Sequence, residues 1–180
     1  MGVPRHPRPV KPFASVIFKD RRCFDACIPS LEKAIGPVEE VSAEMPFDHT
    51  SYYEEEMGSG LRRAFVLFKG LVEREGMHRL KVLTNGVEGL FLVSGKRVVN
   101  IDPGYIALEH VVLLTTKGYT HRIYLSQGIF ADLTLVFERG SFRALPWTYP
   151  DYRGEHVITL FNGWRERYKL ELRGAECSRA

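Results

Sequence analysis

The segment from residue 115 to residue 132 carries the side chains best suited to acid–base chemistry. His121 titrates near neutral pH and can serve as an acid or a base. Lys117 and Arg122 can hold a phosphate or a carboxylate. Asp132 interrupts an apolar run, so we expect it to be partly buried and paired with one of these three residues. Alternation along a strand predicts that His121 and Arg122 point to opposite faces. His121 and Asp132 are therefore candidate catalytic residues, with a structural ion pair as the alternative.

A long loop at residues 48–58 carries three consecutive glutamates, Glu54, Glu55 and Glu56, after two tyrosines. Carboxylate oxygens are the ligands that hard divalent cations such as Mg²⁺ prefer. Long loops in compact domains are often functional, so this loop is a candidate site for a metal ion or for a cationic group. The alternative is a solvated loop or a short helix with one glutamate turned inward.

Residues 100–105, Asn-Ile-Asp-Pro-Gly-Tyr, contain the pattern of a helix start, with Asp as the cap and Pro in the first turn. A helix N-terminus directly after a strand can bind an anion. Asp102 is accordingly a candidate catalytic carboxylate and Tyr105 a candidate ligand contact. The alternative role of Asp102 is helix capping alone.

Residues 145–153 form an aromatic strap in which two prolines favour an extended path. Trp147 and Tyr149 offer flat faces for a base or another ring, and Asp151 and Arg153 offer charges beside them. We list these four as candidate ligand contacts. The strap has a second interpretation as a rigid segment that holds the last helix against the body.

These side chains must be positioned by elements that hydrophobic periodicity predicts. The first half favours strands at residues 13–19, 38–47, 61–68 and 97–101, with helices at residues 20–35 and 73–91. This βαββαβ order is typical of a ferredoxin-like fold. Pro29 predicts a kink or a late start in the first helix.

The second half predicts a helix at residues 102–116, an antiparallel β-meander and a C-terminal amphipathic helix with apolar residues between 157 and 172. The meander strands are expected at residues 121–125, 129–138 and 141–145. The fold class is therefore α+β, with residues 13–173 as a single domain. Residues 1–12 are expected to form a basic, proline-rich arm and residues 174–180 a frayed tail.

Composition restricts the function classes. The 180 residues are 44% hydrophobic and 26% charged, and the net charge is +3. The arm alone carries +3, which leaves the body neutral and excludes a strongly basic nucleic-acid domain. The chain has three cysteines, an odd number, and their spacing does not match a disulfide framework. This favours free thiols in a reducing compartment. No signal peptide or membrane-spanning run is apparent, so we expect a cytoplasmic protein without a membrane partner.

RNA binding is the main alternative to a small-molecule site. Residues 64–68, Ala-Phe-Val-Leu-Phe, match the second half of the RNP1 strand of RNA-recognition motifs, although the first half does not match. Phosphate loops of the Walker type and the GxGxxG fingerprint are both absent. A non-catalytic module would contact RNA or a protein through the strap and the basic arm.

Five segments in order resemble one protein family, described as domain of unknown function 4416: FDHTSYYEEEMG, NIDPGY, TTKGYTHRIYL, GIFADLTL and LPWTYPDYR. The resemblance covers nearly the whole chain, and it implies no particular reaction. Whether the protein is an enzyme, and its oligomeric state, therefore stay open. Our hypothesis is one cleft for a phosphorylated or nucleotide-like small molecule, with carboxylates holding a divalent metal and cations holding the anion.

Overall fold

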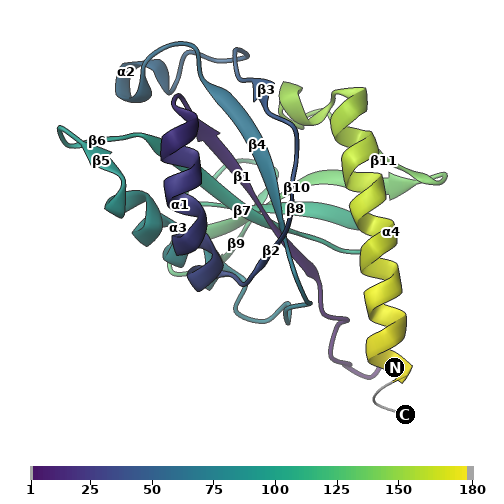
Figure 1. Cartoon of the computed structure of the whole chain (residues 1–180). Helices are drawn as coiled ribbons and strands as arrows, with labels where there is room; N and C mark the ends of the chain where they lie inside the picture. The colour runs from purple at the N-terminus through teal and green to yellow at the C-terminus, as the bar shows by residue number, and fades with distance from the viewer. Residues whose placement is uncertain (1, 178–180) are drawn as a thin grey trace.

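The computed structural model of the chain describes residues 2–177 (Figure 1). The helices in this range are α1 (Arg21–Ala34), α2 (Glu54–Met57), α3 (His78–Leu90), the 3₁₀ helix η1 (Pro150–Tyr152) and α4 (Glu155–Cys177). The strands are β1 (Lys11–Phe18), β2 (Val38–Val41), β3 (Met45–Pro46), β4 (Arg62–Phe68), β5 (Leu92–Val93), β6 (Lys96–Arg97), β7 (Val99–Ile106), β8 (His110–Thr115), β9 (Arg122–Ser126), β10 (Ile129–Glu138) and β11 (Ser141–Ala144). The protein thus mixes α and β structure, as expected.

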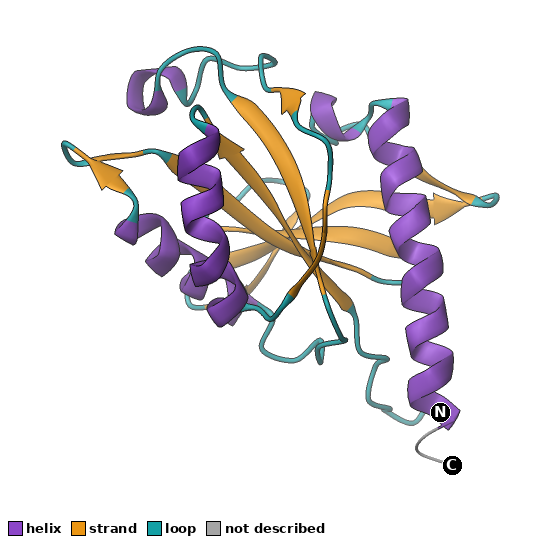
Figure 2. Ribbon diagram, in the orientation of Figure 1, coloured by secondary structure: helices purple, strands orange, loops and turns teal. Residues whose placement is uncertain are grey.

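Nine of these strands form one antiparallel sheet in the order β11-β10-β8-β7-β1-β4-β2, with β3 added beside β4 and β9 beside β10. Helices α1 and α3 cover one face and α4 covers the other (Figure 2). β1 is buried along its whole length because both of its faces are covered. Ala14 and Val16 pack toward α1 and α3, whereas Phe13 packs toward α4.

The C-terminal amphipathic helix is confirmed. In α4, Val157, Phe161, Trp164, Tyr168 and Leu172 recur at helical spacing and all are buried against the sheet. The helix continues through residues 174–177 of the expected frayed tail, and residues 178–180 lie outside the described residues.

The predicted helix at residues 102–116 is wrong, because this segment forms the hairpin of β7 and β8. Asp102 is not a helix cap: it lies within β7, opposite Ser15 of β1. A continuous apolar run fits a buried strand as well as a helix, and tertiary pairing decides here in favour of the strand. Gly104 permits the close packing, since a Cβ at this position would lie 2.4 Å from the Val112 carbonyl oxygen.

Smaller differences concern element ends. The predicted strand at residues 38–47 is divided into β2 and β3, and α1 starts directly after its cap, Asp20, with Pro29 inside it. β1 begins at Lys11, and Val10 is buried and bridges to Val72. The three strands predicted for the meander form as β9, β10 and β11, but their arrangement is not a meander: β9 and β11 both pair with one edge of β10, because β8 pairs with its other edge. None of the helices within residues 2–177 is long and apolar enough to span a membrane.

Candidate functional site

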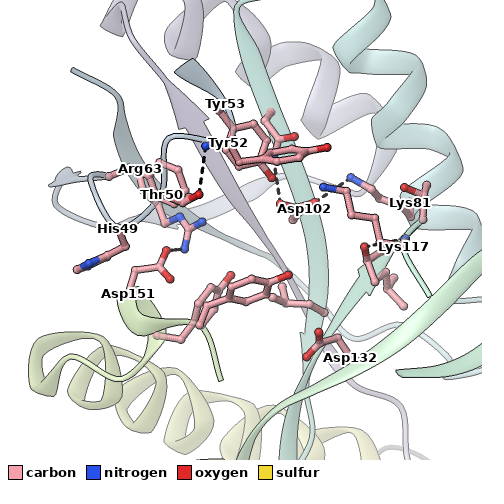
Figure 3. Close-up of a pocket in the computed structure, with 18 of the residues that line it drawn as sticks. His49, Thr50, Tyr52, Tyr53, Arg63, Lys81, Asp102, Lys117, Asp132 and Asp151 are labelled. Atoms are coloured by element: carbon pink, nitrogen blue, oxygen red, sulfur yellow. Dashed lines mark hydrogen bonds and ion pairs between the residues drawn. The ribbon is translucent and has the colours of Figure 1, made fainter. Parts of the chain in front are cut away.

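The sheet splits between β7 and β8. The two strands pair only over Gly104–Ile106 and Val111–Leu113. Residues 99–103 of β7 stay with β1, while the end of β8 continues beside β10. The strands therefore separate beyond Gly104, and a cavity of about 610 Å³ opens where they part (Figure 3).

Polar side chains replace apolar ones on the floor of this cavity. Asp102 of β7 lines the cavity and lies opposite Ser15, which is fully buried beneath it on the same face of β1 as Phe13. Two residues further along β1, Ile17 lies between Arg63 of β4 and Asn100 of β7. Both of these polar residues line the cavity. A sheet face that packs against α4 along part of its length thus becomes the polar floor of the cavity.

Lys81 of α3 fixes Asp102 at the side of the cavity. Its ammonium lies 2.9 Å from Asp102 Oδ1 and 2.6 Å from the Ile101 carbonyl oxygen, and Asn100 Nδ2 donates to Asp102 Oδ2 at 2.9 Å. Burial alone would raise the pKa of Asp102, but the attraction of Lys81 and its hydrogen bond outweigh burial and lower it. Asp102 is therefore an ionised carboxylate already paired with a cation.

The three glutamates do not converge. Glu56 accepts from Arg97 Nε and Nη2, each at 2.7 Å, and the hydrogen bonds from Arg97 lower the pKa of Glu56. Glu54 and Glu55 are exposed. This is the arrangement of the alternative interpretation, a short helix with one glutamate turned inward. No group of three or more His, Cys, Asp or Glu side chains within the described part of the chain is arranged to hold a metal ion.

Arg63 and Asp151 form a buried ion pair on the opposite side of the cavity (Figure 3). The Arg63 guanidinium lies 4.6 Å from the centre of the Phe47 ring and 5.2 Å from that of Tyr152. Asp151, a candidate ligand contact, lines the cavity, but its charge is already balanced by Arg63.

The predicted pairing of Asp132 is confirmed. Its Oδ2 lies 2.8 Å from Arg122 Nε and 3.3 Å from His121 Nε2. The expectation that His121 and Arg122 point to opposite faces is wrong, because His121 precedes β9 and strand alternation does not govern it. Arg122 Nη2 also donates to the Tyr149 hydroxyl at 2.5 Å, and burial raises the pKa of Tyr149.

Asp132 and Tyr149 line the cavity, whereas His121, Arg122 and Trp147 lie behind them. The His121 ring stacks on Trp147 with centroids 5.1 Å apart, and Trp147 Nε1 donates to the Leu133 carbonyl oxygen at 2.8 Å. This group ties the strap to β10.

Arg153 and Tyr105 lie away from the cavity. Arg153 donates to the carbonyl oxygens of Thr148 and Pro146, which supports the interpretation of residues 145–153 as a strap. Tyr105 packs into a separate apolar cluster. Neither residue lines the cavity.

Lys117 differs from the other cations that line the cavity. Arg63, Lys81 and Arg97 each contact a carboxylate. Lys117 has no carboxylate partner among the described residues, and its ammonium lies 3.7 Å from the centre of the Tyr52 ring. Among the lysines and arginines of the described residues that line the cavity, it is the one without an ion pair.

Sequence reasoning missed Arg63, Lys81 and Arg97. Arg63 is the buried one of the two arginines that begin the apolar strand β4, and Lys81 and Glu88 are buried on α3. Only Arg63, beside a run of apolar residues, left a signal in the sequence, because Lys81 and Arg97 acquire their carboxylate partners through tertiary contacts.

The RNP1-like strand does not offer a surface to RNA. Residues 64–68 of β4 are fully buried, with Phe65 and Leu67 under α4 and the alternate residues under α1. RNA-recognition motifs need an exposed sheet face for base stacking.

The chain matches the model of a domain of unknown function, DUF4416, over residues 8–168 of its 180 residues. The match spans β1 to most of α4 and includes every residue that lines the cavity. The protein therefore belongs to this family. No curated protein sequence matches the chain.

Proposed function

We propose that the cavity between β7 and β8 binds a small molecule that combines a flat ring with an anionic group, such as a phosphorylated or nucleotide-like compound. Its volume of about 610 Å³ lies within the range of ligand pockets, roughly 300–1,000 Å³.

The ammonium of Lys117 is the main evidence for the proposal. Its ammonium stands at the cavity without a carboxylate partner among the described residues, while the neighbouring cations are neutralised by ion pairs. Thr115 and Thr116 also line the cavity beside it. An ammonium next to two hydroxyl donors is suited to a phosphate or a carboxylate.

Aromatic side chains support the ring component of the ligand. The cavity is lined by two neighbouring tyrosines of the loop before α2, Tyr52 and Tyr53, and by Tyr149 and Tyr152 of the strap. Burial raises the pKa of Tyr53 and of Tyr149, so both phenols stay protonated at neutral pH. They can pack against a ring and still donate a hydrogen bond from the hydroxyl.

A thermal-shift panel tests the proposal. Nucleotides and sugar phosphates would be added to the purified protein, each with and without Mg²⁺. A ligand at a hundred times its dissociation constant stabilises the folded state by about 2.7 kcal/mol, which corresponds to roughly 5–11 °C for a chain of this size.

The matched variants are Lys117→Ala and Lys69→Ala, which remove the same charge inside and outside the cavity. Lys69 is exposed in the turn after β4 and does not line the cavity. We expect the shift to disappear in Lys117→Ala and to persist in Lys69→Ala. An equal shift in both variants, or no shift with any compound, would contradict the proposal.

We further propose that the unit β1-α1-β2-β4-α3-β7 is ferredoxin-like and that it folds with the rest of the sheet as a single cytoplasmic domain. The strand order β7-β1-β4-β2, antiparallel throughout and with α1 and α3 on one face, supports the first part. The free thiols of Cys23 and Cys27 support a reducing location.

A further inference from the structure

β9 is an exposed edge strand with an apolar surface. It pairs with β10 on one side, and its other side pairs with none of the described strands. Ile123, Tyr124 and Leu125 are 72%, 59% and 41% exposed. The one charged residue of the strand, Arg122, turns inward to Asp132, so the edge itself presents no charge.

The other outer strands of the described sheets are short or carry charged residues, as is usual for soluble proteins. On β2, Glu39 and Glu40 pair with Arg167 of α4. β3 and β5 are only two residues long, β11 carries Arg143, and β6 consists of Lys96 and Arg97. β9 lacks each of these protections.

We propose that β9 is the contact surface between two copies of this chain, which pair antiparallel through β9 and join their sheets. A two-fold axis at Tyr124 places this tyrosine opposite its own copy and Ile123 opposite Leu125 of the second copy. The tyrosines then form an aromatic pair, and Ile123 and Leu125 form aliphatic pairs. Cross-strand pairs of these kinds stabilise sheets.

The charge distribution favours a second copy over other partners. The uncharged edge can approach its copy without repulsion between like charges. A nucleic acid or an acidic peptide would need a cation on the edge, and the guanidinium of Arg122 is already bound by Asp132. The proposal is independent of the ligand site, because Ile123, Tyr124 and Leu125 do not line the cavity.

Sedimentation equilibrium of the full chain is the first test. We expect a species of twice the 20.6 kDa chain mass. Ile123→Lys places a charge on the edge and should weaken dimerisation about tenfold or more. Leu170→Lys, at an exposed leucine of α4, is the matched control and should leave the dimer intact. A monomeric wild-type chain would overturn the proposal and leave the edge to a strand of another protein, and an unchanged dimer in Ile123→Lys would overturn it as well.

Disulfide trapping tests the register and does not depend on a destabilising change. In a chain whose Cys23 and Cys177 are replaced by serine, Tyr124→Cys should form a covalent dimer under mild oxidation. Ile123→Cys alone should not, but it should cross-link when mixed with Leu125→Cys. A dimer in solution that Tyr124→Cys fails to trap would overturn the proposed pairing.

Discussion

Replacing Lys81 by methionine tests whether the buried charges beside the cavity act as a pair. Lys81 is 5% exposed, and its ammonium contacts Asp102 at 2.9 Å and Glu88 at 3.6 Å. Methionine keeps much of the side-chain volume but leaves the carboxylates without this partner. Breaking a buried ion pair in this way costs about 3–5 kcal/mol. For a chain of this size we expect the thermal midpoint at pH 7 to fall by roughly 6–20 °C.

The stability that Lys81→Met loses should depend on pH. In the wild type the pKa of Asp102 is lowered, so its stabilising contribution is present above the unfolded pKa and is lost as pH falls through the folded value. The pKa of Lys81 is raised, because its two carboxylates outweigh burial, so its contribution is also complete at pH 7. Without Lys81, burial raises the pKa of Asp102. Lowering the pH then protonates Asp102 and removes the cost of its unpaired charge, which stabilises the variant relative to the wild type. The difference between the two proteins should narrow between pH 7 and about pH 4.

Chemical denaturation at several pH values measures both effects. Lys81→Met, Asp102→Asn and the double variant complete a cycle, from which we expect a coupling energy of at least about 1 kcal/mol. Arg79→Met, at an exposed position of the same helix, should change the free energy of unfolding by no more than about 0.5 kcal/mol. A difference of the same size at every pH, or additive single changes, would refute the reasoning.

Three further outcomes follow from the packing. Gly104→Ala should destabilise the protein by about 1–3 kcal/mol in urea unfolding. A Cβ at this position would lie 2.4 Å from the Val112 carbonyl oxygen and 2.7 Å from the Phe13 ring. A variant as stable as the wild type would contradict the packing of the hairpin. Phe161→Ala should cost about 3–5 kcal/mol in the same assay, since the ring is fully buried between α4 and the sheet, and a loss below 1 kcal/mol would show that α4 is loosely docked. Cys27 should resist thiol reagents at pH 8 until the protein unfolds, because burial raises its pKa to about 12; labelling of the native protein at this site would disprove that burial.

The elements with strong periodicity could be predicted from the sequence. α4 has five apolar residues at helical spacing, and all five are buried. α1 has a capping aspartate at its start and a glycine shortly after its end, and Asp20 accepts from the backbone of Arg22. In these segments the local signal and the tertiary packing favour the same structure.

The hairpin of β7 and β8 could not be predicted in this way. Asp102, Pro103 and Gly104 match a helix start, and the turn between the strands, Ala107-Leu108-Glu109, contains neither glycine nor proline. Only pairing with β1 and β10, which are distant in sequence, selects the strand conformation.

The site could be predicted only in part, because contacts between segments that are distant in sequence create much of it. Asp132 lies in a strand with clear alternation, so its need for a partner was visible, and the partners proved to be His121 and Arg122. Lys81 was missed because it meets Asp102 only after α3 docks beside β7. A cavity that forms between two separating strands leaves no local pattern in the sequence.

Mapping a ligand by NMR tests the central claim most directly. The compound with the largest thermal shift would be titrated into ¹⁵N-labelled protein. We predict that chemical-shift changes concentrate on the amides of Thr115, Lys117, Asp102 and Tyr149, which all line the cavity. Changes confined to the faces of α1 or α4, with these four amides unmoved, would contradict the assignment of the cavity as the binding site.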